Sequence, residues 1–136
     1  MVGALPKELA ALGHDVRIVC PAYGSVRIYT PRTARPDPLG VDVGTEAHWA
    51  RTWETTLPGA KVPVYLIEHD GFFARPEVYS GPHGSLGDND LRFAFLSRAA
   101  LTLCQQLGWT PDVVHGHDWT TGLVPVFLNK IGRAHV

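Results

Sequence analysis

Residues 111–123, PDVVHGHDWTTGL, constrain the fold of this chain more than any other stretch. Val113 and Val114 are typical of a short strand covered on both faces, where an apolar run replaces strict alternation. His115 and His117 follow, and they would project to the same side of an extended segment because side chains alternate along a strand. The pattern predicts a buried strand that delivers two imidazole groups to one side of a sheet.

A helix is expected directly after this predicted strand. Thr120 or Thr121 can cap such a helix, because a side-chain oxygen at its start accepts a backbone N–H that has no partner within the helix. Ligands of open α/β sheets bind beyond the carboxyl ends of the strands. The sequence therefore places His115, His117 and Asp118 in a ligand-binding crevice.

The rest of the chain alternates helical and strand patterns. Apolar stripes predict helices over residues 5–12 and 89–107, with Asp88 as a suitable N-cap for the second. Runs of β-branched residues predict strands over residues 16–20 and 62–68. Helix–strand–helix order at both ends of the chain predicts an α/β fold with a Rossmann-like three-layer parallel sheet.

A different pattern occupies residues 41–57, where apolar side chains fall on odd positions. This period of two predicts an antiparallel strand pair, or one long bent strand, with one exposed face. Trp49 and Trp53 share the odd register of Val41, which favours burial in the core over an exposed platform for stacking carbohydrate. Three prolines within residues 31–39 predict an exposed loop.

The composition excludes several classes of function. The 136 residues carry a net charge of −1 without a basic cluster, so nucleic acid and anionic membranes are not expected as partners. No apolar run reaches membrane-spanning length, and the N-terminus lacks the layout of a signal peptide. Cys20 and Cys104 are expected to be buried reduced thiols, which is consistent with a cytoplasmic location.

Several separated motifs, in the same order along the chain, resemble a known family. They are VGALPK at 2–7, GHDV at 13–16, VPVYLI at 62–67, DN at 88–89, RF at 92–93, GW at 108–109 and PDVVHGHDW at 111–119. Together they resemble the N-terminal catalytic domain of bacterial glycogen synthases and plant starch synthases. The resemblance runs through nearly the whole chain apart from the last six residues, and the combination is far more specific than any single motif.

The resemblance implies a retaining glucosyltransferase. Such an enzyme transfers glucose from ADP-glucose to the non-reducing end of an α-1,4-glucan, and it needs neither a metal nor a cofactor. The resemblance also implies the GT-B architecture, in which two Rossmann-like domains face a cleft, and a bacterial, cytoplasmic protein. The partners implied are the ADP-glucose donor, the α-1,4-glucan acceptor and a C-terminal domain of the same protein.

The same resemblance assigns site residues. The histidine of the His-Asp-Trp motif lines the pocket around the transferred glucose, which makes His117 the expected catalytic residue and Asp118 its neighbour in the substrate site. The Asp-Asn pair lies near the same cleft, which adds Asp88 and Asn89 as substrate-binding residues. His117 would act through its imidazole on a sugar hydroxyl, or through its backbone carbonyl on the positive charge at the anomeric carbon.

The chain also departs from the family pattern. The Lys-Thr-Gly-Gly-Leu loop, whose lysine meets the donor phosphates, would precede Met1, and the C-terminal domain is absent. We therefore expect residues 1–130 to be a partial N-terminal catalytic domain that is inactive alone. Residues 131–136, IGRAHV, match one reading frame of a common sequencing adapter, and we expect them to be a non-native tail.

Alternatives remain at the level of residues and of function. Asp118 and Asp88 each suit a helix cap as well as a sugar contact, and capping is favoured for Asp118. Arg92 would pair with Asp88 across one helical turn as a modest surface effect. Two other functions are a non-catalytic glucan-binding fragment and a zinc hydrolase, suggested by the His-x-His-Asp spacing of residues 115–118.

Overall fold

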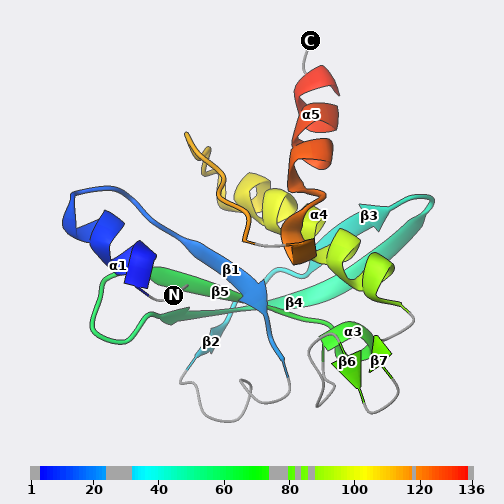
Figure 1. The fold of residues 1–136 in the computed structure, drawn as a ribbon, viewed down its shortest axis with the longest axis horizontal. Coiled ribbons are helices and arrows are strands. Elements are labelled where there is room, and N and C mark those ends of the chain that lie inside the picture. Colours follow the sequence, from blue (N-terminus) through cyan, green and yellow to red (C-terminus); the bar gives the residue numbers. More distant parts are fainter. Residues whose placement is uncertain are drawn as a thin grey trace. The chain divides into compact units, whose positions relative to one another are not determined.

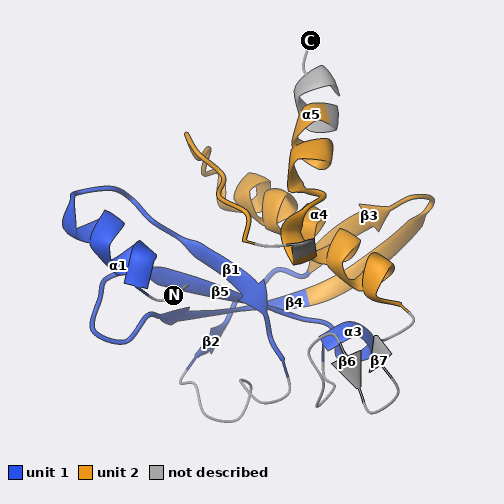
Figure 2. Cartoon of the chain, in the orientation of Figure 1, with its two compact units in different colours: residues 1–38, 51–76 blue, residues 39–50, 77–136 orange. Residues whose placement is uncertain are grey.

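The computed structural model describes residues 4–23, 32–73, 80–81, 84–85, 88–117 and 119–134. It has the α/β composition that the sequence predicts (Figure 1). The chain divides into two compact units, one made of residues 1–38 and 51–76 and the other of residues 39–50 and 77–136 (Figure 2). Strand β4 (Glu46–Thr56) runs from the second unit into the first, so each unit contains one part of this strand.

The first unit is built on a mixed sheet. Strand β1 pairs with β5 in parallel, and β5 and β2 each pair with β4 in antiparallel fashion, giving the order β1-β5-β4-β2. Its elements are α1 (Ala4–Ala11), β1 (Ile18–Pro21), β2 (Thr33–Ala34), residues 51–56 of β4, β5 (Pro63–Glu68) and α3 (Asp70–Phe73). The parallel pair agrees with the predicted helix–strand–helix order, and the antiparallel pairing of β4 agrees with the period of two over residues 41–57. Strand β2 is a short departure from the loop predicted for residues 31–39.

One cluster of apolar side chains holds this sheet together. Strand β5 is the most buried strand, since Val64 and Leu66 retain 8% and 2% of their exposure. The buried members of the cluster are Ala22, Val64 and Leu66, with Ile18, Cys20, Trp53 and Leu57 packed against them. Burying a Val or Leu side chain contributes about 1.5–3 kcal/mol. The indole N–H of Trp53 donates to Glu68 Oε2 at 2.8 Å, so its polar group is paired while its ring adds apolar area.

Cys20 is a free thiol within this cluster, and burial raises its pKa to about 11. A higher pKa leaves less thiolate at a given pH, and the thiolate is the nucleophile. We expect iodoacetamide to alkylate Cys20 about 100-fold more slowly in the folded chain than in the urea-unfolded chain at about pH 8. Mass spectrometry of timed samples measures the rate. Equal rates in the folded and unfolded chains would contradict the burial of this thiol.

The second unit is organised by helix α4. Its elements are β3 (Leu39–Val43), the first part of β4, β6 (Ser80–Gly81), β7 (Gly84–Ser85), α4 (Asn89–Leu107), the 3-10 helix η1 (Trp119–Thr121) and α5 (Val124–Ala134). Helix α4 packs against β3, η1 and α5. The apolar residues that it buries are Phe93, Phe95, Leu96, Ala99, Leu101 and Leu103. It ends at Gly108, whose φ of 64° forms the left-handed C-cap that its sequence position predicts.

The hairpin of β3 and β4 corrects one prediction. Its two-residue turn at Gly44 and Thr45 pairs Val43 with Glu46, so odd positions of β3 lie opposite even positions of β4. Directly opposed residues of an antiparallel pair share a face. The apolar register of β3 therefore continues on His48 and Ala50, and the ring of His48 contacts that of Phe95 on α4, at 6.0 Å between centroids.

Trp49 lies on the opposite face of this hairpin and remains 65% exposed, so the prediction of core burial is wrong for this residue. Core burial of Trp49 would require one odd register across both strands, whereas the turn changes the parity between them. For Trp53 the prediction is partly correct, because this side chain is half-buried and packs against the cluster of the first unit.

The predicted strand at Val113 and Val114 does not form in this structure. Residues 113–117 have no strand assignment, and Val113 and Val114 remain 80% and 37% exposed. A strand is stabilised by the ladder it forms with a neighbour, and among the described residues none pairs with this segment. Val113 and Val114 therefore form an apolar surface suited to burial. No strand in the described part of the chain pairs with it.

The backbone of α5 continues as a helix to Ala134, and the non-native origin of residues 131–136 stays a prediction. Within the part of the chain that the structure describes, every helix is too short or too polar to cross a membrane.

Candidate functional site

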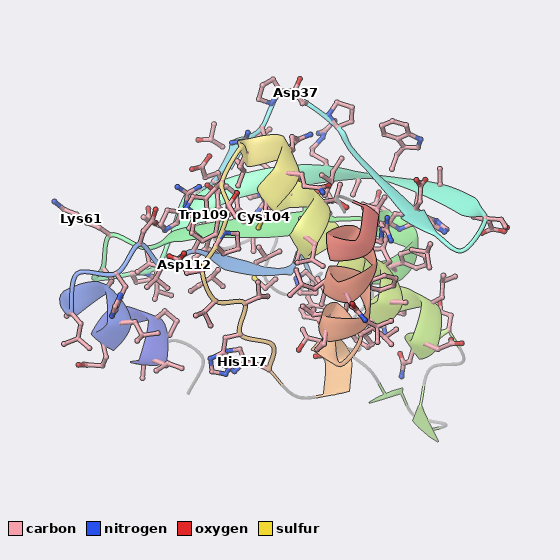
Figure 3. All side chains as sticks on the ribbon, turned by 90° about the horizontal axis from the view of Figure 1, so that it is seen from above. Asp37, Lys61, Cys104, Trp109, Asp112 and His117 are labelled. Atoms are coloured by element: carbon pink, nitrogen blue, oxygen red, sulfur yellow. The ribbon has the colours of Figure 1, made fainter. Side chains whose placement is uncertain are left out.

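His117 lies on the exposed segment that leads from α4 to η1 (Figure 3). Its ring stacks on that of His115, with 4.3 Å between centroids and 12° between planes. This confirms that the two side chains project to the same side, although the segment is not a strand. Stacking restricts both rings, because a parallel arrangement is lost when either ring rotates. His117 is thus exposed to solvent with one face covered.

The backbone of His117 is held by two threonine hydroxyls. Thr121 Oγ1 donates to the carbonyl oxygen of His117 at 3.0 Å, and Thr120 Oγ1 donates to the same oxygen at 3.4 Å. The sequence predicted that one of these residues would cap a helix, but η1 follows first and α5 begins only at Val124. A carbonyl oxygen has two lone pairs, and both are engaged here. The imidazole is therefore the group of His117 that is available to a ligand.

Gly116 is required for this arrangement. A Cβ atom at this position would lie 2.8 Å from Thr121 Oγ1 and 3.4 Å from the Thr121 carbonyl oxygen. The contact with the hydroxyl is too short for a carbon atom, the contact with the carbonyl oxygen is an ordinary one, and the hydroxyl belongs to a short β-branched side chain. The glycine therefore allows the close approach that brings the Thr121 hydroxyl to the His117 carbonyl.

We expect Gly116→Ala to displace Thr121 and to lower the free energy of unfolding by about 1–2 kcal/mol, from crowding and a strained hydrogen bond. Thr121→Val is the matched control, because it keeps the shape of the side chain and removes only the hydroxyl donor. Urea unfolding followed by circular dichroism measures both. A Gly116→Ala chain as stable as the unmodified chain would contradict the close packing.

The second cluster lies at the N-terminus of α4. Asp88 occupies the predicted N-cap position, but its side chain forms no capping hydrogen bond. Asn89 is the first residue of the helix, and its Oδ1 accepts a hydrogen bond of 2.8 Å from Arg92 Nη1. This hydrogen bond fixes the orientation of the Asn89 side-chain amide.

Arg92 is fully buried, with 0% of its surface exposed, and this corrects the prediction that it makes a modest surface pair with Asp88. Its guanidinium carbon lies 5.1 Å from the centre of the Phe93 ring. A guanidinium stays charged, so burying it is costly unless it is hydrogen-bonded. The i, i+3 spacing of Asn89 and Arg92 on the predicted helix is the sequence signal for their hydrogen bond, which was not among the predictions.

The predicted site residues thus form two clusters in the same unit. His117 belongs with His115, Thr120 and Thr121, and Asn89 belongs with Arg92. Helix α4 packs against η1, so the element after His117 lies beside the helix that Asn89 begins. The other predicted substrate residue, Asp118, lies outside the described residues. Within the described ranges, no three His, Cys, Asp or Glu side chains form a group that could hold a metal ion.

Comparison with known proteins decides the family. The profile of the starch synthase catalytic domain matches residues 1–136. The chain belongs to the starch synthase catalytic domain family. Neither a zinc hydrolase nor a non-catalytic module is favoured by this match.

Several bacterial glycogen synthases are similar to this chain. Glycogen synthase 1 of Geobacter sulfurreducens is 46% identical over 137 residues, which cover 98% of the chain and 27% of that protein. Glycogen synthase of Treponema denticola is 42% identical over 128 residues, covering 93% and 26%. The chain spans about a quarter of the length of these relatives.

A solved structure in the same family supports the fold. It is the catalytic domain of starch synthase IV from Arabidopsis thaliana bound to ADP and acarbose. The TM-score is 0.80 and the sequence identity 31%, with 94% of the chain and 26% of that protein covered. The exposed segment with His117 and the N-terminus of α4 therefore belong to a chain with the fold of a starch synthase.

Proposed function

We propose that this chain forms part of the N-terminal catalytic domain of a retaining GT-B glucosyltransferase. The proposed reaction transfers glucose from ADP-glucose to the non-reducing end of an α-1,4-glucan. The observation that carries the proposal is His117, whose imidazole is exposed while its main chain is fixed by two threonines, in a chain of the starch synthase family. A fixed polar group at a solvent-open position suits recognition of a sugar hydroxyl.

The roles proposed for the two clusters differ. His117 hydrogen-bonds a hydroxyl of the transferred glucose, and His115 keeps the ring of His117 in position by stacking. Asn89 contacts the sugar through its side-chain amide, whose orientation Arg92 fixes by donating to Oδ1. Asp88 and Asp118 are proposed as further contacts to the sugar. Groups that are already oriented lose little conformational entropy when they bind a substrate, which favours a productive geometry.

The partners proposed for the complete enzyme are the ADP-glucose donor, the glucan acceptor and a C-terminal domain of the same protein. The starch synthase relative bound to ADP and acarbose supports a nucleotide and a sugar as ligands. The length of the relatives, of which the chain covers 27% or less in the two cases above, supports the need for further residues. We propose that the chain alone does not transfer glucose.

The proposed location is the bacterial cytoplasm. Both cysteines of the chain, Cys20 and Cys104, are free thiols, which persist in a reducing compartment. The relatives from Geobacter and Treponema support a bacterial source.

A chimeric enzyme tests the proposed reaction. In it, residues 1–130 replace the matching segment of Geobacter sulfurreducens glycogen synthase 1. We expect the chimera to transfer labelled glucose from ADP-glucose to maltotriose without added metal, and the chain alone to transfer none. The unmodified Geobacter protein is the positive control. A folded chimera that transfers no glucose would contradict the proposal.

A further inference from the structure

The exposed face of the β3–β4 hairpin carries one large aromatic side chain. Trp49 is 65% exposed and lies opposite Gly40 in the strand pairing. A Cβ atom on Gly40 would lie 3.0 Å from both Cη2 and Cζ3 of the indole and 3.4 Å from Cε3. The six-membered ring therefore covers the main chain of Gly40, as aromatic side chains do across from glycine in sheets. One face of the indole is packed, and most of its remaining surface is open.

The neighbours of Trp49 on this face are small or charged. Asp42 and Ala47 oppose each other two pairs closer to the turn, on the same face as Gly40 and Trp49, and both are exposed. Ala47 is too small to cover the ring from the side. Asp42 places a carboxylate, which can accept hydrogen bonds from hydroxyl groups, on the same face of the hairpin as the open aromatic surface.

We propose that Trp49 and Asp42 form a binding site for a pyranose ring of an α-glucan chain. The apolar C–H face of the sugar stacks on the open indole, and the carboxylate of Asp42 accepts a hydrogen bond from a sugar hydroxyl. This inference rests on the proposed function, because the acceptor of that reaction is the polymer that would occupy the site. It adds a second point of contact for the same polymer.

The composition of the face favours sugar over a protein partner. The core of a protein interface is a contiguous apolar patch that is depleted of charge. Here a single aromatic residue of the hairpin stands among exposed polar or small side chains, which are those of Asp42 and Ala47 on the same face and of Thr45 in the turn. One flat apolar surface with an adjacent carboxylate suits one sugar ring, which is apolar on its face and polar at its edge.

The position of the site gives it a role distinct from that of His117. Figures 1 and 3 both draw the turn of the β3–β4 hairpin and residues 112–117 on opposite sides of α4, within the same unit. A glucan held at Trp49 would remain tethered while its end enters the transfer site. Tethering raises the effective concentration of chain ends, so the site would favour long acceptors over short ones.

Nuclear magnetic resonance of the 136-residue chain tests the site directly. The four tryptophans give four indole N–H signals, and Trp49→Phe identifies the one from Trp49. We expect maltoheptaose to shift the Trp49 signal with a dissociation constant of about 1–10 mM, while glycerol at equal hydroxyl concentration does not. Trp49→Leu, which still covers Gly40 but lacks an aromatic face, should weaken binding at least about fivefold. Asp42→Asn should weaken it about twofold to fivefold.

The outcomes separate this inference from the proposed function. No shift of the Trp49 signal up to about 20 mM maltoheptaose, or equal binding by the Trp49→Leu chain, would overturn the site. Neither measurement involves donor or transfer, so both are independent of the chimera assay with maltotriose. In the chimera, Trp49→Leu should raise KM for glycogen severalfold and leave kinetics with maltotriose unchanged. Loss of both activities would instead indicate a structural role for Trp49.

Discussion

Replacing His117 with alanine is expected to lower kcat for glucosyl transfer by about 100-fold or more in the chimeric enzyme, because a single oriented hydrogen-bonding group at a reacting centre contributes about 2.7–4 kcal/mol. The side chain is exposed, so its removal leaves no cavity. The stability of the protein should therefore change by less than about 0.5 kcal/mol. Initial rates over a range of ADP-glucose and maltotriose concentrations separate kcat from KM, and thermal unfolding checks the fold.

His115→Ala is the matched control for this substitution. It removes the stacking partner and leaves the His117 imidazole in place, so we expect a smaller loss of kcat than in His117→Ala. A His117→Ala enzyme with unchanged transfer would retain the family assignment but would remove His117 from the catalytic site. A loss of stability equal to the loss of activity would indicate a role in folding.

Arg92→Ala is expected to lower the free energy of unfolding by about 3 kcal/mol. The substitution removes a fully buried side chain and leaves Asn89 Oδ1 without its hydrogen bond, so the cost of a cavity adds to that of an unpaired polar group. Urea unfolding of the chain, followed by circular dichroism and by tryptophan fluorescence, measures this difference.

Arg98→Ala provides the comparison on the same helix. Arg98 is half-buried, and its guanidinium carbon lies 5.4 Å from the centre of the Phe127 ring, a contact that contributes about 0.5–1 kcal/mol. The difference between the two variants therefore isolates the buried position of Arg92. If both variants lost the same stability, the guanidinium of Arg92 would have no special role in holding Asn89.

The features that the sequence predicted well are determined by local patterns. The extent of α4 follows from its apolar stripe, from Asp88 before it and from Gly108 after it, all of which lie within or beside the helix. The parallel pair of β1 and β5 follows from helix–strand order, and the antiparallel excursion from a period of two. The α/β class was therefore accessible from the sequence.

The errors concern contacts between elements. The face on which Trp49 lies depends on which residues pair across the turn at Gly44, and alternation along one strand does not contain that information. The strand expected at Val113 needs a neighbour that the described part of the chain does not supply. Both errors have the same cause. A period of two or an apolar run shows that a segment has an apolar surface, but it does not show which other element packs against that surface.

The candidate site shows the same division. The identity and spacing of His115 and His117 predicted that their side chains share one side, which the stacked rings confirm. The hydroxyls of Thr120 and Thr121 were expected at a helix terminus, but they reach back to the His117 carbonyl because Gly116 allows a close approach. The burial of Arg92 depends on the packing of α4 and could not be derived from its charge.

One edge of strand β1 has no partner strand among the described residues, and this edge favours association between copies of the chain. Strand β1 is the outermost strand in the order β1-β5-β4-β2, and among the described residues β5 is its only partner. Its second edge therefore presents main-chain donors and acceptors that another strand can use, with Pro21 unable to donate at one end. Two copies of the chain can align along this edge at high protein concentration. Purification at low concentration, with light scattering as a check for dimers, would preserve the monomer required for the binding and unfolding measurements.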